Sequence, residues 1–333
     1  MRYYYWPAFD GIEGLALGSR PEPIPGPRQV LVRMRAWSLN HRDLLIADNR
    51  YGRDIEPGLI PVSDGAGDVV DVGPDVTRWR AGDRVMGVFM PNWLTGPPTD
   101  ENTRAALGGT VDGLLAEYVV FDEEALLGVP EHLDFTEAAT LPCAAATVWH
   151  CFLGAGPLSE QQVLTLGSGG VSVFAVQFAA VSGARVLSTS SSDERLARLA
   201  SLGASAGVNY VNTPEWGRAI FELSHGGVDH VIEVGGAGTL SESIRAVRTG
   251  GRISLVGVLS QGVGLSPVPL LRKALTIRGM LVGSRDTAES MCAFVSEHRI
   301  HPVIDSVFPF SEVIEAYRHL ASKSHFGKVV ISR

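Results

Sequence analysis

The stretch from Val163 to Ala175, VLTLGSGGVSVFA, determines how most of this chain is expected to fold. Its apolar start is typical of a buried parallel strand, and it breaks into Gly167, Ser168, Gly169 and Gly170. Glycines at a strand-to-helix junction allow a tight turn and a close approach to a pyrophosphate, whose charge the helix N-terminus stabilises. The stretch therefore predicts a dinucleotide-binding loop.

The residues around this loop make the interpretation more specific than a glycine motif alone. The last glycine of the usual motif is replaced by Ser172. Residues Val173–Ser182 predict a helix of small side chains, and Ala184–Thr189 predict a second strand. Strand, helix and strand follow one another at the spacing of a βαβ unit, which supports the dinucleotide-binding prediction.

The end of the second strand indicates which dinucleotide is bound. An acidic residue there binds the ribose hydroxyls of NAD and repels a 2′-phosphate. Here the strand ends in Ser190, Ser191 and Ser192, and Arg195 follows one helical turn later. Hydroxyl donors and a guanidinium favour a phosphate, so we expect NADP(H). These residues also fit a helix start in which Ser191 is the N-cap and Glu194 completes a capping box, and the two roles are compatible.

Length and composition predict a soluble enzyme of two domains. The 333 residues exceed what one core usually organises, and 45% of them are hydrophobic. A net charge of −8 disfavours nucleic acid as a partner. The sequence has no apolar run near the roughly 20 residues that a membrane span needs and no signal-like N-terminus. Three scattered cysteines, Cys143, Cys151 and Cys292, indicate no disulfide framework, so we expect a cytoplasmic protein.

The first 120 or so residues predict a β-barrel lobe. Val30–Trp37 alternates apolar and polar residues, and Gly67–Gly73 and Asp83–Val88 are short strand-like runs bounded by turn residues. The polar segment Pro91–Gly109 contains Gly-Pro-Pro and Thr-Asp-Glu-Asn. We expect this segment to be a surface loop.

From about Thr136 the pattern changes to alternating helices and strands, which predicts a doubly wound parallel sheet of six strands. The expected strands are Val163–Leu166, Arg185–Thr189, Val208–Tyr210, Val228–Val234, Arg252–Val258 and Leu275–Gly279. Glu194–Leu202 and Leu240–Val247 are among the intervening helices. We expect the last helix, Ser311–Ser322, and the last strand, Lys328–Ser332, to return to the first lobe.

Several separate segments support a family resemblance: SLNHRD (38–43), PVSDGAG (61–67), GDRV (82–85), LPC (141–143), TVW (147–149), the glycine loop and FGKVV (326–330). In this order they resemble the medium-chain dehydrogenase/reductase superfamily, in particular its zinc-independent quinone oxidoreductase-like and alcohol dehydrogenase-like branch. The resemblance covers essentially the whole chain. It implies an α/β fold with a GroES-like catalytic domain (1–123 and 290–333), a Rossmann domain (124–289), an active-site cleft between them and commonly a homodimer.

The resemblance also shows where this chain departs from the zinc-containing branch. That branch has a cysteine in place of Asn40 and a His-Glu pair in place of Ser63 and Asp64. Cys143 stands where some zinc enzymes have a third ligand. A catalytic zinc needs about three protein ligands, and amide and hydroxyl groups are poor substitutes. Segment 91–109 also lacks the cysteines of the family's structural zinc site. We therefore expect no metal and a packed Cys143 thiol near the nicotinamide.

Without a metal, hydrogen-bond donors must polarise the substrate carbonyl as hydride arrives. Asn40 matches the asparagine of the zinc-independent branch, and Tyr51 lies where that branch often has an aromatic residue. The alternative is that Asn40 caps a turn and Tyr51 packs in a loop. Asp43 resembles the acidic partner of this asparagine, or it caps a helix at Leu44–Ala47.

Three further residues are secondary catalytic candidates. His41 can act as an acid because its ordinary pKa lies near neutrality. Ser63 and Asp64 can orient a water molecule or a substrate hydroxyl, or they can hold a loop in place.

The remaining cofactor contacts are expected from the family layout and from the carboxyl ends of the parallel strands. Besides the loop residues 167–170 and the serines, these candidates are Cys143, Thr147, Val171, Tyr210, Glu233, Gly235, Gly257, Val258, Leu259, Leu281, Val282 and Lys328.

Together, these features predict an NADPH-dependent, zinc-independent oxidoreductase that reduces a quinone, an α,β-unsaturated carbonyl or a simple carbonyl. Two alternatives stay open. One is an NADP-dependent alcohol dehydrogenase that acts on alcohols and aldehydes. The other is a weakly catalytic nucleotide-binding redox sensor.

Overall fold

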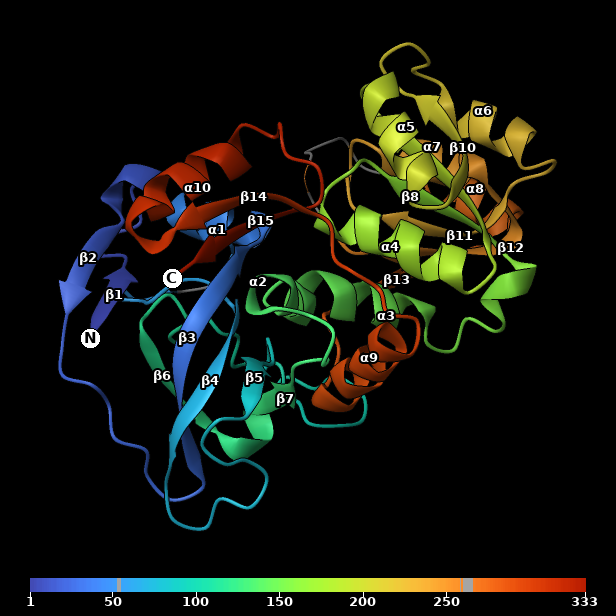
Figure 1. Cartoon of the computed structure of the whole chain (residues 1–333). Helices are drawn as coiled ribbons and strands as arrows, with labels where there is room; N and C mark the ends of the chain where they lie inside the picture. The colour runs from blue at the N-terminus through green and yellow to red at the C-terminus, as the bar shows by residue number, and fades with distance from the viewer. Residues whose placement is uncertain (53–54, 258, 260–265) are drawn as a thin grey trace. The chain divides into compact units, whose positions relative to one another are not determined.

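The computed structural model describes residues 1–52, 55–257, 259 and 266–333, and the chain divides into two compact units. Unit 1 contains Met1–Ala146 and Val282–Arg333, and unit 2 contains Thr147–Leu281 (Figure 1). Segments 124–146 and 282–289, which we expected in the Rossmann domain, belong to unit 1. The reason is that β7 (Leu126–Gly128) pairs with β5, and α9 (Arg285–Glu297) packs against β7.

Unit 1 is built on a seven-stranded sheet in the order β14-β15-β3-β4-β5-β7, with β6 also paired to β3. The bounds of the strands not yet given are β3 Gln29–Leu39, β4 Asp64–Val72, β5 Arg84–Gly87, β6 Tyr118–Asp122, β14 Ile304–Pro309 and β15 Lys328–Ser332. β15 pairs antiparallel with β3, so that the last strand of the chain lies beside one of the first. The expected return of the C-terminal segment to the first lobe is therefore confirmed.

Short elements complete unit 1: β1 Arg2–Tyr5, η1 Ile12–Gly14, β2 Ala16–Ser19, α1 His41–Ala47, η2 Glu123–Ala125, α2 Phe135–Ala138, η3 Leu141–Ala145, η5 Phe310–Glu312 and α10 Val313–Ala321. Helix α3 (Ala146–Phe152) begins at the last residue of this unit.

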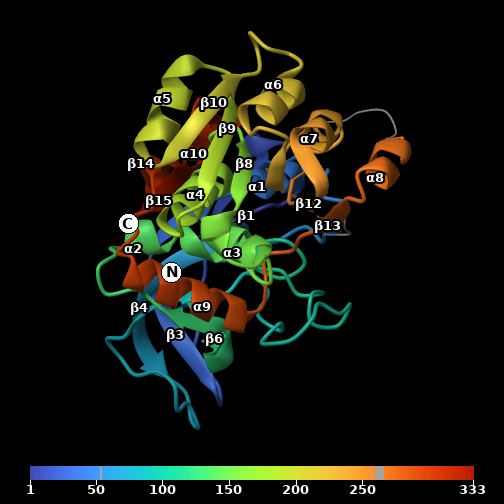
Figure 2. The ribbon, with the colours of Figure 1, turned by 90° about the vertical axis from the view of Figure 1, so that its right-hand side faces the viewer.

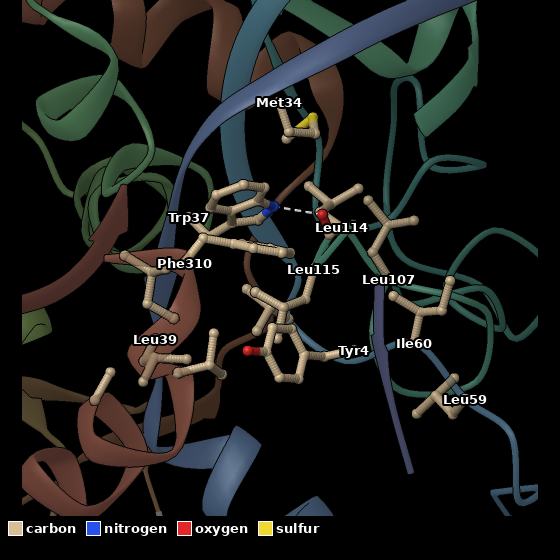
Figure 3. Close-up of a cluster of buried hydrophobic side chains, with 14 of the residues drawn as sticks. Tyr4, Met34, Trp37, Leu39, Leu59, Ile60, Leu107, Leu114, Leu115 and Phe310 are labelled. Carbon is tan, nitrogen blue, oxygen red and sulfur yellow. Dashed lines mark hydrogen bonds between the residues drawn. The ribbon is translucent and has the colours of Figure 1, made fainter. Parts of the chain in front are cut away.

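The core of unit 1 is a buried cluster of aliphatic and aromatic side chains (Figure 3). The Trp37 ring lies 4.8 Å from that of Phe310, and its Nε1 donates a hydrogen bond to the carbonyl of Leu114. Trp6 packs edge-on against Tyr317 of α10. Burying each of these rings contributes on the order of 2–3 kcal/mol. This packing holds α10 against the sheet beside α1.

Segment 91–109 contains no helix or strand, but the expectation of a simple surface loop is wrong at both of its ends. Trp93 is buried, and Leu107 belongs to the hydrophobic core of unit 1. The carbonyl of Leu107 accepts a hydrogen bond from the buried Arg42 guanidinium. The polar residues in the middle of the segment gave no indication that Trp93 and Leu107 are buried.

Unit 2 is the predicted doubly wound parallel sheet, with six strands in the order β10-β9-β8-β11-β12-β13. All of its strand pairs are parallel, and the order reverses between β8 and β11. The strand bounds are β8 Gln162–Leu166, β9 Arg185–Ser190, β10 Ala204–Asn209, β11 Val228–Glu233, β12 Val247–Leu255 and β13 Thr276–Gly279. Ligands of such sheets bind at the carboxyl ends of the strands, near the reversal point.

Helices cover this sheet, as the second view shows (Figure 2). Their bounds are η4 Leu158–Glu160, α4 Gly170–Val181, α5 Asp193–Ser201, α6 Trp216–Leu223, α7 Leu240–Ala246 and α8 Val268–Arg272. α4 begins three residues before the expected start because Gly170 and Val171 are already helical. β10 and β12 begin earlier than expected because backbone pairing extends into small and polar residues that have no strand-like pattern. Within the described parts of the chain, no helix is long and apolar enough to cross a membrane.

Candidate functional site

Three strand ends in unit 1 bring the first group of candidate residues together. Asn40 directly follows β3, Asp64 is the first residue of β4, and Lys328 is the first residue of β15. β3 lies between the other two strands: Ser38 pairs with Asp64, and Leu39 pairs with Val329. Strand pairing alone therefore places these three side chains at one end of the sheet.

Asn40 also begins helix α1. Its backbone N–H donates a 2.7 Å hydrogen bond to Asp43 Oδ2, as in a capping box. The helix therefore starts at His41, three residues before the expected start at Leu44. Asp43 is 1% exposed, and burial raises the pKa of its carboxyl to about 6, against the lowering effect of Arg42. Asp43 is therefore the third residue of the helix and bonds back to its N-cap Asn40, so it does not cap a helix at Leu44 as expected.

The Asn40 side chain bridges two charged groups. Lys328 Nζ donates a 2.6 Å hydrogen bond to Asn40 Oδ1, and Asn40 Nδ2 donates one of 2.9 Å to Asp64 Oδ2. Lys328 Nζ also donates to the carbonyl of Leu39 at 2.8 Å. Lys328 is 3% exposed and Asp64 is fully buried. The amide therefore has one orientation, with its oxygen toward the ammonium and its nitrogen toward the carboxylate.

Asp64 accepts hydrogen bonds through both of its carboxylate oxygens. Ser63 Oγ donates to Oδ1 at 2.8 Å, and the backbone N–H of Cys143 donates to Oδ2 at 3.3 Å. Burial raises the pKa of Asp64, while Lys328 and the hydrogen bonds from Asn40 and Ser63 lower it. Ser63 thus holds the Asp64 carboxylate, a role that differs from both roles expected for it.

A zinc ion does not fit this donor set. Asn40 and Asp64 already use both polar ends of their side chains in hydrogen bonds. Cys143 adds a thiol next to Asp64, but a catalytic zinc needs about three protein ligands. Among the described residues, no group of three or more His, Cys, Asp or Glu side chains is arranged to hold a metal ion.

The structure places Tyr51 and His41 beside this cluster but not within it. The Tyr51 ring lies 4.9 Å from the Arg42 guanidinium, which supports the packing role. No hydrogen bond joins Tyr51 to Asn40, Asp64 or Lys328. His41 is half-buried, and its pKa is lowered by burial and by the charges of Lys323 and Arg50. The neutral imidazole is therefore favoured near pH 7.

In unit 2, the glycine loop joins β8 to α4 as expected. Gly167 has a φ of +74°, a conformation that favours glycine, and Gly169 is the N-cap of α4. A Cβ atom added at Gly169 would meet nothing within 4 Å, so the space in front of the loop is open. Ser172 Oγ donates to the carbonyl of Leu166 at 2.5 Å and braces the turn. These features fit a bound pyrophosphate.

The serines at the end of β9 have distinct environments. Ser190 is buried, and its Oγ has no hydrogen-bond partner among the described residues. The N-cap of α5 is Ser192, which accepts a 3.2 Å hydrogen bond from the N–H of Arg195. The expectation that Ser191 is the N-cap is therefore wrong by one residue. Ser191 is left half-buried beside the orphaned Ser190 hydroxyl.

Glu233 has a structural role where we expected a direct cofactor contact. Its carboxylate accepts hydrogen bonds from the N–H groups of Gly235 and Gly236 at 2.7 and 3.0 Å. The hydroxyls of Thr239 and Ser243 also donate to it. All of these partners follow β11, so the buried carboxylate shapes the β11–α7 connection from within.

The other candidates are placed as follows. Thr147 and Val282 are buried. Gly257 packs tightly against the backbone, because a Cβ atom added there would lie 2.2 Å from the carbonyl oxygen of Val234. Tyr210, Leu259 and Leu281 are exposed. Val258 lies outside the described residues. Contact of these residues with the cofactor stays a prediction.

Two features of the site had only weak signals in the sequence. Arg42 is buried, with its guanidinium between the Tyr51 and Phe89 rings, and we had not assigned it a role. Lys328 contacts Asn40, although we expected it to contact the cofactor. A basic residue inside an otherwise apolar segment, as in FGKVVI, is the only hint that it is buried.

Comparisons with known proteins agree with the fold and define the family. The model of the alcohol dehydrogenase GroES-like domain matches residues 26–131, and the zinc-binding dehydrogenase model matches residues 170–297. A zinc-type alcohol dehydrogenase-like protein of Schizosaccharomyces pombe is 44% identical over 92% of this chain and 91% of its own. The chain belongs to the alcohol dehydrogenase-like proteins of the medium-chain dehydrogenase/reductase superfamily.

Solved structures give the same result. A candidate alcohol dehydrogenase from Sinorhizobium meliloti is 40% identical, with a TM-score of 0.92 over 100% of this chain and 99% of its own. An NAD-dependent alcohol dehydrogenase is 32% identical, with a TM-score of 0.92 over the full length of both chains. The protein is an oxidoreductase of this family, and a nicotinamide cofactor follows from that membership. The predicted superfamily and fold class are confirmed.

Proposed function

We propose that this protein is an NADPH-dependent oxidoreductase that reduces a simple carbonyl, an α,β-unsaturated carbonyl or a quinone without a catalytic metal. The proposal rests on one observation: the Asn40 amide is held between Lys328 and Asp64 where the zinc branch has its ligands. Such an amide presents a hydrogen-bond donor in a fixed direction. The same groups serve the reverse reaction, oxidation of an alcohol with NADP⁺.

The proposed stabilisation of the substrate oxygen depends on the hydrogen-bond donors of the Asn40 amide. An Asn side chain has two N–H groups, and Asp64 accepts from one of them. The second can donate to a substrate oxygen as negative charge develops there. Donors of this kind typically contribute about 10²–10³ in kcat. The nicotinamide, when bound, supplies the hydride. We assign the later proton transfer to solvent or His41, whose neutral form can accept and pass on a proton.

The cofactor preference is argued from the end of β9. No carboxylate stands at this strand end, the buried Ser190 hydroxyl lacks a partner, and Ser191 lies next to it. A 2′-phosphate would accept hydrogen bonds from both and would be favoured by the charge of Arg195. One similar structure is of an NAD-dependent enzyme, so NADH is the competing candidate. The redox-sensor alternative is less favoured, because the chain has a held Asn40 amide as well as a complete dinucleotide-binding unit, and a nucleotide sensor needs only the second.

The test is a titration of chelator-treated protein with NADPH and NADH, followed by oxidation of the better ligand with an aldehyde, an enone and a quinone. We expect tighter binding of NADPH and turnover with no added metal. Tighter binding of NADH would overturn the assignment of Ser190, Ser191 and Arg195. Turnover that appears only after zinc is added would overturn the hydrogen-bond mechanism. A homodimer remains a prediction, to be checked by light scattering on the same sample.

A further inference from the structure

We propose that Lys328 is a positioning residue for the reaction: its ammonium holds the Asn40 amide so that the amide nitrogen faces the substrate oxygen. This role differs from the cofactor contact expected from the sequence. It deepens the proposed function and rests on it.

The first argument is geometric. Lys328 Nζ donates to Asn40 Oδ1 at 2.6 Å and to the Leu39 carbonyl at 2.8 Å, so the ammonium is tied to the end of β3. The register of β15 against β3, with Val329 opposite Leu39, puts it there. The first bond determines which end of the amide is the acceptor.

The second argument is electrostatic. No direct ion pair joins Lys328 to Asp64 among the described contacts, because the Asn40 amide lies between them. Rotating the amide by half a turn would set its oxygen against the Asp64 carboxylate and its N–H groups against the ammonium. Both new contacts would be repulsive in a buried setting, where charges interact strongly. Lys328 and Asp64 therefore lock the amide together.

The third argument concerns the neighbouring charges. Arg42, Asp43, Asp64 and Lys328 are all buried, two positive and two negative. Lys328 lowers the pKa of Asp64 against the raising effect of burial, which favours the carboxylate form that accepts hydrogen bonds. Without the ammonium, the pKa of Asp64 would rise further and Asn40 would lose both fixed partners.

The experiment compares Lys328→Met and Lys328→Arg with a matched control, Lys273→Met. Lys273 is also partly buried and donates to three carbonyls, those of Ile244, Arg245 and Val247, but it has no part in the proposed site. We expect kcat of Lys328→Met to fall about 10- to 100-fold, as for misplacement of a reacting group. We expect the Kd for NADPH to change by less than about twofold, or 0.4 kcal/mol. The control and the wild type should have equal kcat.

A second readout requires no turnover. The side-chain NH₂ of Asn40, assigned by ¹⁵N NMR with an Asn40→Ala variant, should exchange slowly with water in the wild type and in the control. It should exchange faster in Lys328→Met, and Lys328→Arg should restore part of the protection. A merely structural lysine would not change exchange at this one amide in a folded variant.

The double variant Lys328→Met/Asp64→Asn keeps the test meaningful if the single variant folds poorly, because it removes both charges. We expect recovered thermal stability without recovered kcat. Recovery of both would overturn the positioning role, and so would a lowered affinity for NADPH with unchanged kcat at saturation. A wild type with no NADPH-dependent turnover would instead overturn the proposed function.

Discussion

At the scale of single residues, the side chains of the candidate site hold one another through charges and hydrogen bonds. The Asn40 amide between Lys328 and Asp64 is the clearest case. Replacing it removes the proposed donor without touching the glycine loop. We expect Asn40→Ala to lower kcat about 10²–10³-fold with little change in the Kd for NADPH. Steady-state kinetics and fluorescence titration measure the two quantities. Exposed Asn212 offers the control Asn212→Ala, which should behave as the wild type.

Asp43 makes stability depend on pH in an unusual direction. Burial raises its pKa from 3.8 to about 6 in the folded protein. Between these values the folded state binds a proton that the unfolded state has released, so stability falls as pH rises from about 4 to 6. The shift corresponds to about 3 kcal/mol. Asp43→Asn keeps an oxygen acceptor for the backbone of Asn40 and cannot ionise.

The measurement is the thermal midpoint of wild type and Asp43→Asn across this pH range. We expect the midpoint of the wild type to drop relative to that of the variant as pH increases. A constant difference between the two proteins would mean that Asp43 does not titrate in this window.

At the scale of elements, the two serines at the start of helix α5 differ in role, because only one of them is the N-cap. Ser192 accepts the hydrogen bond from the N–H of Arg195, and Ser191 does not. Loss of an N-cap typically costs about 1 kcal/mol. We therefore expect Ser192→Ala to lower the stability of unit 2 by about that amount, while Ser191→Ala leaves it nearly unchanged. Chemical denaturation followed by circular dichroism tests this. The reverse order would restore Ser191 as the cap.

The β11–α7 connection depends on one buried carboxylate. Glu233→Ala removes the acceptor of all four of these hydrogen bonds. Leaving such donors unpaired costs on the order of 1–3 kcal/mol. We expect a lower thermal midpoint and faster hydrogen exchange at Gly235 and Gly236. Exposed Glu222, which pairs with Arg218 in its own helix, supplies the control Glu222→Ala, which should change little.

At the scale of the whole molecule, the two units differ in how the chain builds them. Unit 2 is continuous, Thr147–Leu281, and contains its own hydrophobic core. Unit 1 needs the C-terminal segment, because β15 and α10 complete its sheet and core. We expect the fragment 147–281 to unfold cooperatively and to be stabilised by NADPH, since a ligand at 100 times its Kd adds about 2.7 kcal/mol.

A truncation after Leu281 is the matched counterpart of this fragment. It removes β15, α10 and Lys328 together. Calorimetry of this form should show the transition of unit 2 alone. If instead unit 1 still melted cooperatively, the C-terminal segment would not be part of its core.

The sequence by itself determined the architecture and the family. Glycine geometry, strand periodicity and the order of short motifs are local properties, so the glycine loop, the six parallel strands and the return of the last strand could be predicted. The starts of β10 and β12 and the N-cap of α5 were predicted at the wrong residues. They depend on pairing partners and backbone geometry, which local composition does not indicate.

Only the tertiary structure decided what the polar residues of the site do. Asn40, Asp64 and Lys328 are far apart along the chain and meet because β3 pairs with β4 on one side and β15 on the other. A buried charged group needs a hydrogen-bond partner, so Lys328 bonds to Asn40 and Glu233 bonds to the backbone of the loop that follows it. Hydrogen-bond partners and desolvation arise only once the strands are assembled, and a single sequence holds no direct signal for them.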